Sequence, residues 1–233
     1  MYSTKRQGHK RECSETDTYP IRPMPHSEAR SELATIAHLI PQPMLAHDAL
    51  LRMLALHDAD TSHHSHVVSH LTHALATRLD LSPVKLEVIT LGALLHDIGK
   101  TAIPTALLNK SGKLTATEWA MMRQHPEMGE RIIAAEPSLQ GCMAAVRHHH
   151  ERWDGGGYPD NLSGEAIPLA ARIIAVADTF AVITSARSYQ AARSGFDALT
   201  ELERCAGTQF DPAIVATLVS VMADGASLAT IAA

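Results

Sequence analysis

Aromatic side chains are scarce in this chain of 233 residues, because phenylalanine, tryptophan and tyrosine together make up 4% of it. The hydrophobic residues, 45% of the total, are therefore mostly aliphatic residues and methionine, a mixture that favours helices over β-sandwiches and barrels. Cysteine is scarce as well, since Cys13, Cys142 and Cys205 are odd in number and far apart. This usage argues against a disulfide framework and predicts reduced thiols in a cytoplasmic protein.

A basic surface and a long apolar run are also missing. The formal net charge of −5 argues against a protein that binds nucleic-acid polymers through their phosphates. Residues 1–20 are polar and basic, unlike a signal peptide. The most membrane-like run, near the C-terminus, stops at Asp224-Gly225, short of the roughly 20 residues that a membrane span needs. We therefore expect no membrane segment and a C-terminal run that docks as a helix.

The chain is predicted to carry one folded domain of the all-α class, because it shows no repeats and no convincing strands. Its first 30 or so residues are polar and interrupted by three prolines, which is typical of a disordered arm. The expected divisions are an arm with a weak helix at about 27–40, spanning 1–44, a single compact helical domain spanning 45–225, and a tail spanning 226–233.

Apolar residues at three- and four-residue spacing predict a series of helices in that domain. The expected helices are 43–57, 60–79, 83–97, one that begins after Thr115, 137–150, 167–185, 195–204 and 212–223. Ser82-Pro83 has the pattern of an N-cap followed by proline at the first helical position, and Thr115 with Glu118 has the pattern of a capping box. A glycine-rich loop, Gly155 to Pro168, is the one long connection.

Histidine is the abundant residue, with fifteen copies. In the predicted helix 60–79, His64 shares an apolar stripe with Val68 and Leu71, and Asp60 lies one turn earlier. Taken alone, His64 is more typical of a hydrogen-bonded core histidine than of a metal ligand. A second face of the same helix carries four more histidines, which we interpret as solvated: His63, His66, His70 and His73.

The stretch "LGALLHDIGK" places His96 and Asp97 at the end of a helix that is apolar all round. A carboxylate and an imidazole that are buried together are costly unless they are paired or bound to a metal. Lys100 follows one turn after His96 and brings an ammonium group to the pair. Two interpretations stay open at this point, a structural ion pair between Asp97 and Lys100 and a metal site.

Further imidazoles and carboxylates lie at the ends or in the apolar interiors of other predicted helices. They are His125 before Pro126, His149 and His150 before the glycine-rich loop, and Asp178 within "RIIAVADTF". Imidazole with carboxylate suits iron, manganese or zinc, and no cysteine is placed to contribute. These ligands exceed what one mononuclear site can use, and a carboxylate such as Asp97 can bridge two ions that together clamp a phosphoryl group.

The order of these motifs resembles the HD-GYP group of HD-superfamily phosphodiesterases. The motifs are His64-Ser65, "HDIGK" (96–100), "LNKSGKLT" (108–115), His125-Pro126, "HHERWDGGGYP" (149–159), Asp178 and "TSARSY" (184–189). The likeness covers about 50–220. It implies an all-α HD-type domain with a glycine-rich GYP loop, which hydrolyses cyclic di-GMP at a site with two or three divalent metal ions, iron or manganese.

The resemblance also assigns roles to individual residues. The implied metal ligands are His64, His96, Asp97, His125, His149, His150 and Asp178, with Asp60 where members with a third metal carry an acidic ligand. Asp97 and Lys100 would be the catalytic residues, with Lys100 holding the scissile phosphate. The implied substrate contacts are Gly157, Tyr158 and Pro159 in a loop beside the cleft, and Arg187.

The likeness weakens at 181–190, where this chain reads "AVITSARSYQ". Arg187 is kept, whereas Ala181, Ala186, Ser188 and Gln190 replace two acids, a proline and a base of the family pattern. The set of metal ligands is thus complete, whereas the substrate contacts are reduced. We therefore expect related cyclic dinucleotides, as well as cyclic di-GMP, as substrates. Another nucleotide is a less favoured substrate.

A second function is a metal-bound signalling module of low activity that acts through a protein partner. By resemblance, that partner would be a diguanylate cyclase (GGDEF) domain, and a homodimer is a further candidate assembly. The complete set of metal ligands favours the enzyme, because a site that has lost its function would lose ligands first.

Replacing Gln190 by lysine is expected to lower the KM for cyclic di-GMP. A base at this position restores a charge-assisted contact, which contributes roughly 1.5–3 kcal/mol when well made. Steady-state kinetics of the wild-type chain and the Gln190→Lys variant on cyclic di-GMP test this. A wild-type KM below micromolar, with strict preference for cyclic di-GMP, would show that other residues have replaced the missing contacts.

Overall fold

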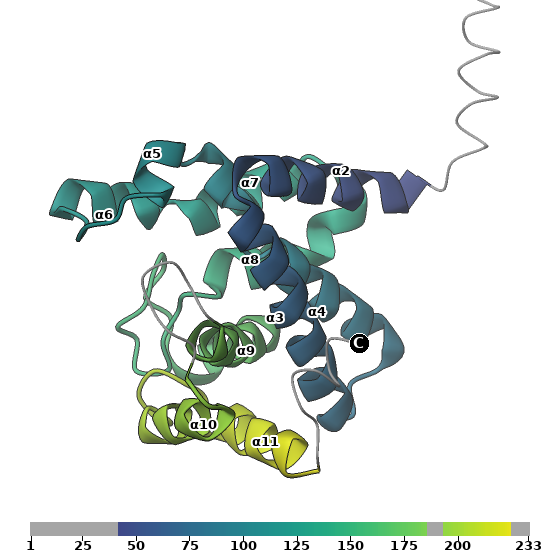
Figure 1. Ribbon diagram of the computed structural model, residues 1–233. Helices are drawn as coiled ribbons and strands as arrows, with labels where there is room; N and C mark the ends of the chain where they lie inside the picture. Colours follow the sequence, from purple (N-terminus) through teal and green to yellow (C-terminus); the bar gives the residue numbers. More distant parts are fainter. Residues whose placement is uncertain (1–41, 186–192, 225–233) are drawn as a thin grey trace, which may run out of the picture. The chain divides into compact units, whose positions relative to one another are not determined.

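A computed structural model describes residues 42–185 and 193–224. The chain divides into two units, Met1–Pro41 and Gln42–Ala233, and all the described residues belong to the second. The α-helices are α2 (Gln42–His57), α3 (Ala59–Arg78), α4 (Pro83–Leu95), α5 (Thr105–Leu108), α6 (Ala116–Met122), α7 (His125–Ala134), α8 (Met143–His148), α9 (Leu169–Thr184), α10 (Gly195–Arg204) and α11 (Pro212–Ala223) (Figure 1). Short 3-10 turns are η1 (Ile98–Ala102), η2 (Pro137–Cys142) and η3 (Gly164–Ala166).

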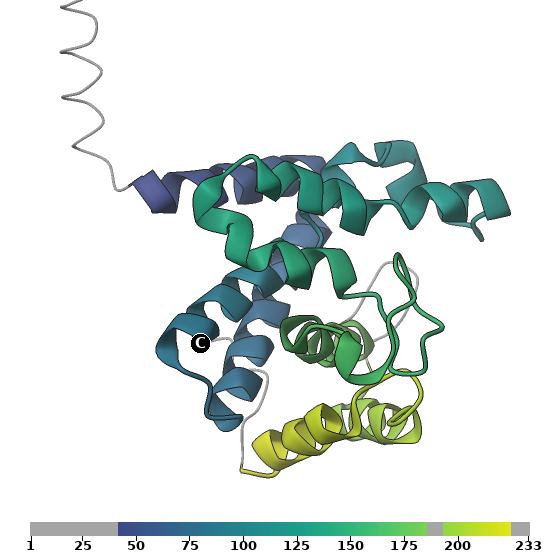
Figure 2. The same ribbon diagram turned by 180° about the vertical axis from the view of Figure 1, so that it is seen from behind.

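The all-α prediction is confirmed for this part of the chain, which forms no strand and only one isolated bridge, between Ala206 and Phe210. In the second unit, α2, α5, α6 and α7 lie along one side and α10 and α11 along the other, with α3, α4, α8 and α9 between them (Figures 1 and 2). None of the described helices is both long enough and apolar enough to cross a membrane.

Two hydrophobic clusters hold this unit together. The larger joins α3, α4, α9, α10 and α11 around fully buried residues such as Leu71, Ile173 and Phe180. The smaller joins α2, α4, η1, α7 and α8 around residues such as Leu54 and Ile133. Burial of one such side chain contributes on the order of 1.5–3 kcal/mol, so the clusters fix the helices that run between them.

Helices α4 and α8 contribute to both clusters. In α4, Ala93 belongs to the larger cluster and Leu95 to the smaller, and in α8 Ala145 and Val146 divide in the same way. A predicted metal ligand directly follows the last residue of each of these helices. It is His96 after α4 and His149 after α8. The candidate ligands are therefore presented at the junction of the two apolar clusters.

Most helix predictions are confirmed, with clear differences in two of them. The predicted helix 83–97 ends at Leu95, and the predicted helix 137–150 divides into η2 and α8, because Pro137 opens a 3-10 turn and Gly141 packs against Val88. Ser82 takes the N-cap position of α4 without a side-chain hydrogen bond. The capping box at Thr115 is present in full. The predicted end of the arm at residue 44 is wrong, because α2 already begins at Gln42. The rest of the arm, its weak helix and the 226–233 tail lie outside the described residues.

Gly99 lets η1 touch the backbone of α7. A Cβ atom on Gly99 would lie 1.9 Å from the carbonyl oxygen of His125 and 2.5 Å from the amide nitrogen of Gly129, which real atoms do not approach. Since Asp97 precedes Gly99 by two residues, this backbone contact is what brings the Asp97 carboxylate beside His125. Glycine is the one residue type that fits such a contact without movement of the chain.

Replacing Gly99 by alanine is expected to lower the free energy of unfolding by about 1–3 kcal/mol, the cost of an overpacked contact between backbones that cannot yield. Urea unfolding of both proteins measures the difference. Gly112→Ala is the matched control, because a Cβ atom at Gly112 meets nothing within 4 Å. Equal unfolding midpoints for the two variants would contradict the close approach.

Candidate metal centre

Three buried imidazoles are held in the same way, each by a hydrogen bond from its Nδ1 to a backbone carbonyl. His96, His125 and His149 each donate to the residue three positions earlier. The distances are 2.6 Å to Ala93, 2.7 Å to Met122 and 2.7 Å to Val146. Because a carbonyl only accepts, Nδ1 carries the ring proton and Nε2 keeps a lone pair. Metal-binding histidines commonly have this tautomer, with the ring nitrogen that does not bind the metal donating to a carbonyl oxygen.

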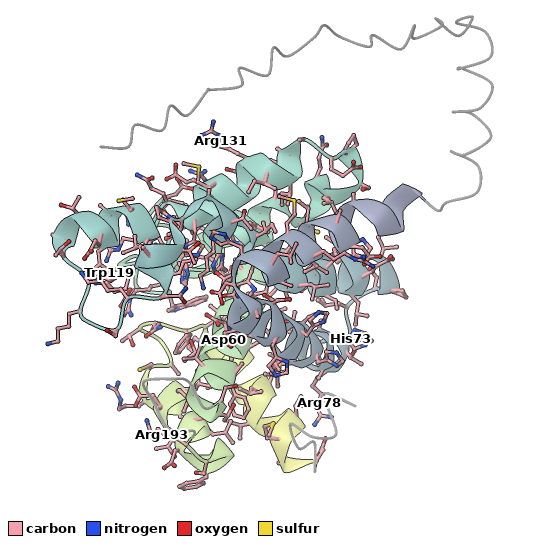
Figure 3. All side chains as sticks on the ribbon, turned by 45° about the horizontal axis from the view of Figure 1, so that its top comes forward. Asp60, His73, Arg78, Trp119, Arg131 and Arg193 are labelled. Atoms are coloured by element: carbon pink, nitrogen blue, oxygen red, sulfur yellow. The ribbon has the colours of Figure 1, made fainter. Side chains whose placement is uncertain are left out.

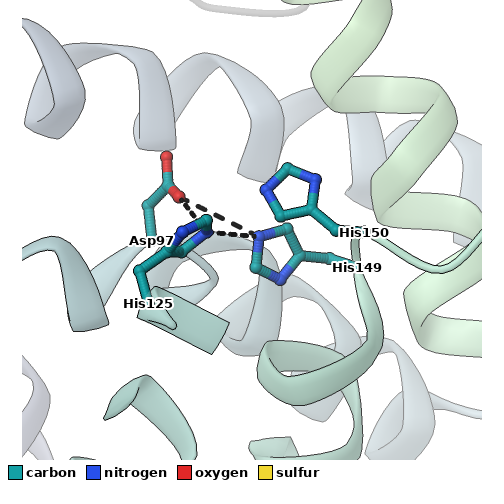
Figure 4. A group of neighbouring side chains, drawn as sticks. All are labelled: Asp97, His125, His149 and His150. Carbon is teal, nitrogen blue, oxygen red and sulfur yellow. Dashed lines mark hydrogen bonds and ion pairs between the residues drawn. The ribbon is translucent and has the colours of Figure 1, made fainter. Parts of the chain in front are cut away.

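The first ligand cluster consists of Asp97, His125, His149 and His150, whose ligand atoms lie within 4.8 Å of one another (Figure 4). His125 Nε2 lies 3.3 Å from His149 Nε2 and 3.3 Å from Asp97 Oδ1. Two nitrogen lone pairs at that separation repel each other unless a proton or a cation lies between them. A metal ion in this cluster would remove that repulsion and bind all four groups.

The second ligand cluster consists of His64 from α3, His96 after α4 and Asp178 from α9, again with ligand atoms within 4.8 Å. His64 Nε2 lies 2.7 Å from Asp178 Oδ1. His96 Nε2 is buried and has no hydrogen-bond partner within the described part of the chain. A buried nitrogen lone pair without a donor is costly in a folded protein, and a bound cation satisfies it.

Asp97 lies between the two clusters. Its Oδ1 faces His125 and His149 of the first, at 3.3 and 3.9 Å. Its Oδ2 faces His96 Nε2 of the second at 3.4 Å and accepts a hydrogen bond from Lys100 Nζ at 2.6 Å. Asp97 Oδ1 has no hydrogen-bond partner among the described residues, although it is buried. A carboxylate with one oxygen toward each cluster has the placement of a bridging ligand.

The charges of these groups suit a cation site. Burial alone would raise the pKa of Asp97, but the charges of Lys100 and His96 outweigh it and hold that pKa well below its usual range. Burial, followed by repulsion from His150, lowers the pKa of His149 far below that of a free imidazole. Burial likewise lowers the pKa of His150 to about 3. An ionised Asp97 beside neutral His149 and His150 suits the donor set of a divalent metal site.

His96 differs from these rings. Burial favours its neutral form, yet the Asp97 carboxylate, assisted by Asp178, outweighs burial and raises the pKa of His96. The same negative field that attracts a proton to His96 Nε2 attracts a metal cation.

The GYP loop packs against the first cluster. The Tyr158 ring stacks on the His150 ring, with centroids 4.9 Å apart and an interplanar angle of 24°. The peptide bond from Tyr158 to Pro159 is cis. A Cβ atom on Gly157 would lie 2.4 Å from the amide nitrogen of Arg152, so the chain passes too close to itself for a side chain. The predicted loop residues therefore lie beside a predicted metal ligand.

Sequence reasoning missed the residues that hold this loop. Glu151 is 4% exposed and accepts hydrogen bonds from the backbone N–H groups of Asp160, at 2.7 Å, and Leu162, at 3.1 Å. Arg147 donates to the Asp160 carboxylate at 2.7 and 2.8 Å and to Glu130 at 2.7 Å. Their positions in the sequence could have pointed to this role. Glu151 directly follows the predicted ligands His149 and His150, and Arg147 lies about one turn before them.

The other positions singled out in the sequence lie outside the two clusters or outside the described residues. Asp60 is exposed in the first turn of α3 and is not in either cluster (Figure 3). Its role as a ligand of a third metal stays a prediction. Arg187 lies outside the described residues, as do Ala186, Ser188 and Gln190. The interpretation of Ala181 as a missing substrate contact is wrong, because α9 buries Ala181 completely in the larger hydrophobic cluster.

The four histidines on the second face of α3 are exposed, as predicted. His73, labelled in Figure 3, is one of them. The structure thus separates His64, which is buried and belongs to the second cluster, from its exposed neighbours on the same helix.

Replacing Glu151 by alanine is expected to speed amide hydrogen exchange at Asp160 and Leu162 by roughly 10-fold or more, since a hydrogen bond to a charged group contributes about 1.5–3 kcal/mol. Hydrogen-exchange mass spectrometry of the loop peptides measures this. Glu165→Ala, at an exposed position in the same loop, serves as the control. Unchanged exchange in the Glu151 variant would show that Arg147 and packing hold the loop without it.

Comparison with known proteins gives a consistent picture. A model of the HD domain family matches residues 48–214. The cyclic di-GMP phosphodiesterase response regulator RpfG of Xanthomonas campestris is 43% identical over 173 residues, which cover 73% of this chain and 46% of that protein. A cyclic di-GMP phosphodiesterase of Thermotoga maritima is 38% identical, over 71% of this chain and 46% of that protein. The chain thus spans less than half the length of these curated relatives.

A further relative is the 3'3'-cGAMP-specific phosphodiesterase 2 of Vibrio cholerae, which is 36% identical over 69% of this chain and 31% of that protein. Solved structures share the fold. A Vibrio cholerae cyclic GMP-AMP phosphodiesterase, V-cGAP3, superposes with a TM-score of 0.59 at 20% identity, over 77% of this chain and 49% of that one. The HD domain of Listeria monocytogenes PgpH, in complex with cyclic di-AMP, gives 0.54 at 20% identity, over 76% and 96%. As its motifs predict, the chain belongs to the HD domain family.

Proposed function

We propose that this chain is a metal-dependent phosphodiesterase that hydrolyses cyclic di-GMP, or a related cyclic dinucleotide, to the linear dinucleotide or GMP. The observation that carries the proposal is the pair of ligand clusters with Asp97 between them. The names of the relatives support the substrate class, since the most similar of them include phosphodiesterases of cyclic di-GMP and of 3'3'-cGAMP.

We propose that each cluster binds one divalent ion, iron or manganese, because the ligands are imidazoles and carboxylates without a thiolate. When bound, two such ions would polarise the phosphoryl oxygens and lower the pKa of a water molecule beside the phosphate. The protein's own part is to hold the ligands. Backbone carbonyls fix three imidazole tautomers, and Gly99 fixes the distance from η1 to α7.

Lys100 is the proposed catalytic cation. Its ammonium group lies 2.6 Å from Asp97 Oδ2, at the boundary of the two clusters, and its side chain is 22% exposed. From that position it can neutralise charge on the phosphate as the bond to the leaving 3' oxygen breaks. The hydrogen bond to Asp97 also orients the carboxylate whose two oxygens serve the two clusters, so both residues contribute to the same centre.

The direct test is metal analysis of anaerobically purified protein, together with a panel of cyclic dinucleotides followed by chromatography. We expect about two metal ions per chain, because each ligand cluster would hold one ion. We also expect the protein to hydrolyse cyclic di-GMP and to lose this activity when a chelator removes the metal. If Asp60 holds a third ion, the wild-type chain will contain about three ions, and the Asp60→Asn variant will contain one ion fewer. Full metal content without hydrolysis of any cyclic dinucleotide would contradict the proposed reaction and would favour the signalling module with a GGDEF partner.

Replacing Asp97 by alanine is expected to abolish turnover while the helical fold persists, because the carboxylate between the clusters is lost. Circular dichroism checks the fold, and chromatography measures hydrolysis. Asp48→Ala, on the exposed side of α2, is the control. A variant that kept more than about a tenth of the wild-type rate, a loss of less than roughly 1.4 kcal/mol, would show that Asp97 is not a bridging ligand.

A further inference from the structure

A cleft of about 520 Å³ opens between α6, the start of α7 and the turn of the GYP loop. This volume lies in the range of sites for small molecules, roughly 300–1,000 Å³. It is lined by Ala116, Trp119, Ala120, Arg123, Gln124, Glu127, Tyr158 and Pro159. None of these residues belongs to the two ligand clusters, so the cleft is a separate feature of the molecule.

The cleft adjoins the metal centre on two sides. Tyr158 forms part of its wall and stacks on the ring of His150, a member of the first cluster. Gln124 forms another part of the wall and precedes His125, a second member of that cluster. A molecule whose phosphate lies at the metal centre can therefore extend into the cleft past the Tyr158 ring.

Two side chains of the cleft have groups that no ion pair or side-chain hydrogen bond occupies among the described residues. Trp119 is 49% exposed and stacks on no other ring there (Figure 3). Arg123 lies over the Tyr158 ring, 5.1 Å from its centroid, and makes no ion pair in the described ranges 42–185 and 193–224. A guanidinium group that lies over a ring still carries N–H donors that can bind a ligand.

We propose that this cleft binds one guanine base of the cyclic dinucleotide, an inference that rests on the proposed function. Arginine donates two hydrogen bonds to the O6 and N7 acceptors of guanine. The carboxylate of Glu127 in the same cleft can accept from the N1 and N2 hydrogens, and the exposed indole of Trp119 offers a surface on which the base stacks. Adenine carries an amino donor in place of O6 and opposes the donors of Arg123.

Base reading of this kind gives the chain a means of selecting among cyclic dinucleotides. The curated relatives include phosphodiesterases named for cyclic di-GMP and for 3'3'-cGAMP, and these two substrates differ in one base. Contacts to the phosphate cannot distinguish them, so the selection depends on groups outside the metal centre. Arg123 is the specificity-determining residue in this proposal, and Trp119 contributes affinity for either purine.

The test compares kcat/KM for cyclic di-GMP and cyclic di-AMP in the full chain. Arg123→Gln should lower the ratio of the two by roughly 10-fold, the discrimination that a bidentate contact supplies. Trp119→Ala should raise the KM for both substrates by roughly 10-fold, as loss of a stacked base does. A variant that folds or binds metal poorly loses kcat/KM for both substrates to the same extent. The ratio of the two kcat/KM values therefore reports base recognition separately from structural damage.

Two controls match the two variants. Arg131→Gln removes an exposed arginine of α7 that does not line the cleft and lies apart from Trp119 (Figure 3), and Phe196→Ala removes an aromatic side chain that is 78% exposed on α10. An unchanged ratio in Arg123→Gln would overturn the assignment of guanine to the cleft, and an unchanged KM in Trp119→Ala would overturn the cleft as a base site. Wild-type protein that hydrolysed neither of these dinucleotides, nor 3'3'-cGAMP, would instead refute the proposed function, and this inference with it.

Discussion

The structure depends on one buried carboxylate. Asp97 is 3% exposed, and the nitrogen lone pairs of His125, His149 and His96 lie around it. Lys100 neutralises one of its oxygens, but Oδ1 is left without a hydrogen-bond donor in the part of the chain that the structure describes. Burying such a group is expensive unless a cation compensates it. The surrounding helices are arranged so that bound metal supplies this compensation, which ties the stability of the centre to its chemistry.

The fold places these ligands by ordinary packing. Helices α4 and α8 are fixed by two hydrophobic clusters, so the ligands that follow them, His96 and His149, have little freedom. The backbone contact at Gly99 then sets the distance from Asp97 to His125. Beyond the centre, Glu151 holds the loop that carries Tyr158, whose ring forms the boundary between the metal ligands and the cleft. The candidate metal centre and the proposed base site thus share one wall, the Tyr158 ring.

The sequence predicted the helices well, and it picked out the imidazoles and carboxylates that the structure gathers into two clusters, because both leave local signals. Apolar spacing, proline and capping patterns mark helices, and an imidazole at the end of an apolar helix is conspicuous. Contacts between distant segments leave no such signal. The burial of Ala181 depends on how α9 packs, and the exposure of Asp60 depends on where α3 begins. The role of Glu151 arises from the path of the loop, which returns to offer two N–H groups to one carboxylate.

The claim that Asp97 bridges two ions is tested most directly by anomalous diffraction at the iron and manganese absorption edges, on crystals of anaerobically purified protein. The account predicts two peaks about 3.5–4 Å apart, the separation of two-metal sites that act on phosphates, with one oxygen of Asp97 bound to each. A single peak, or no peak beside an Asp97 carboxylate that is paired only with Lys100, would contradict it.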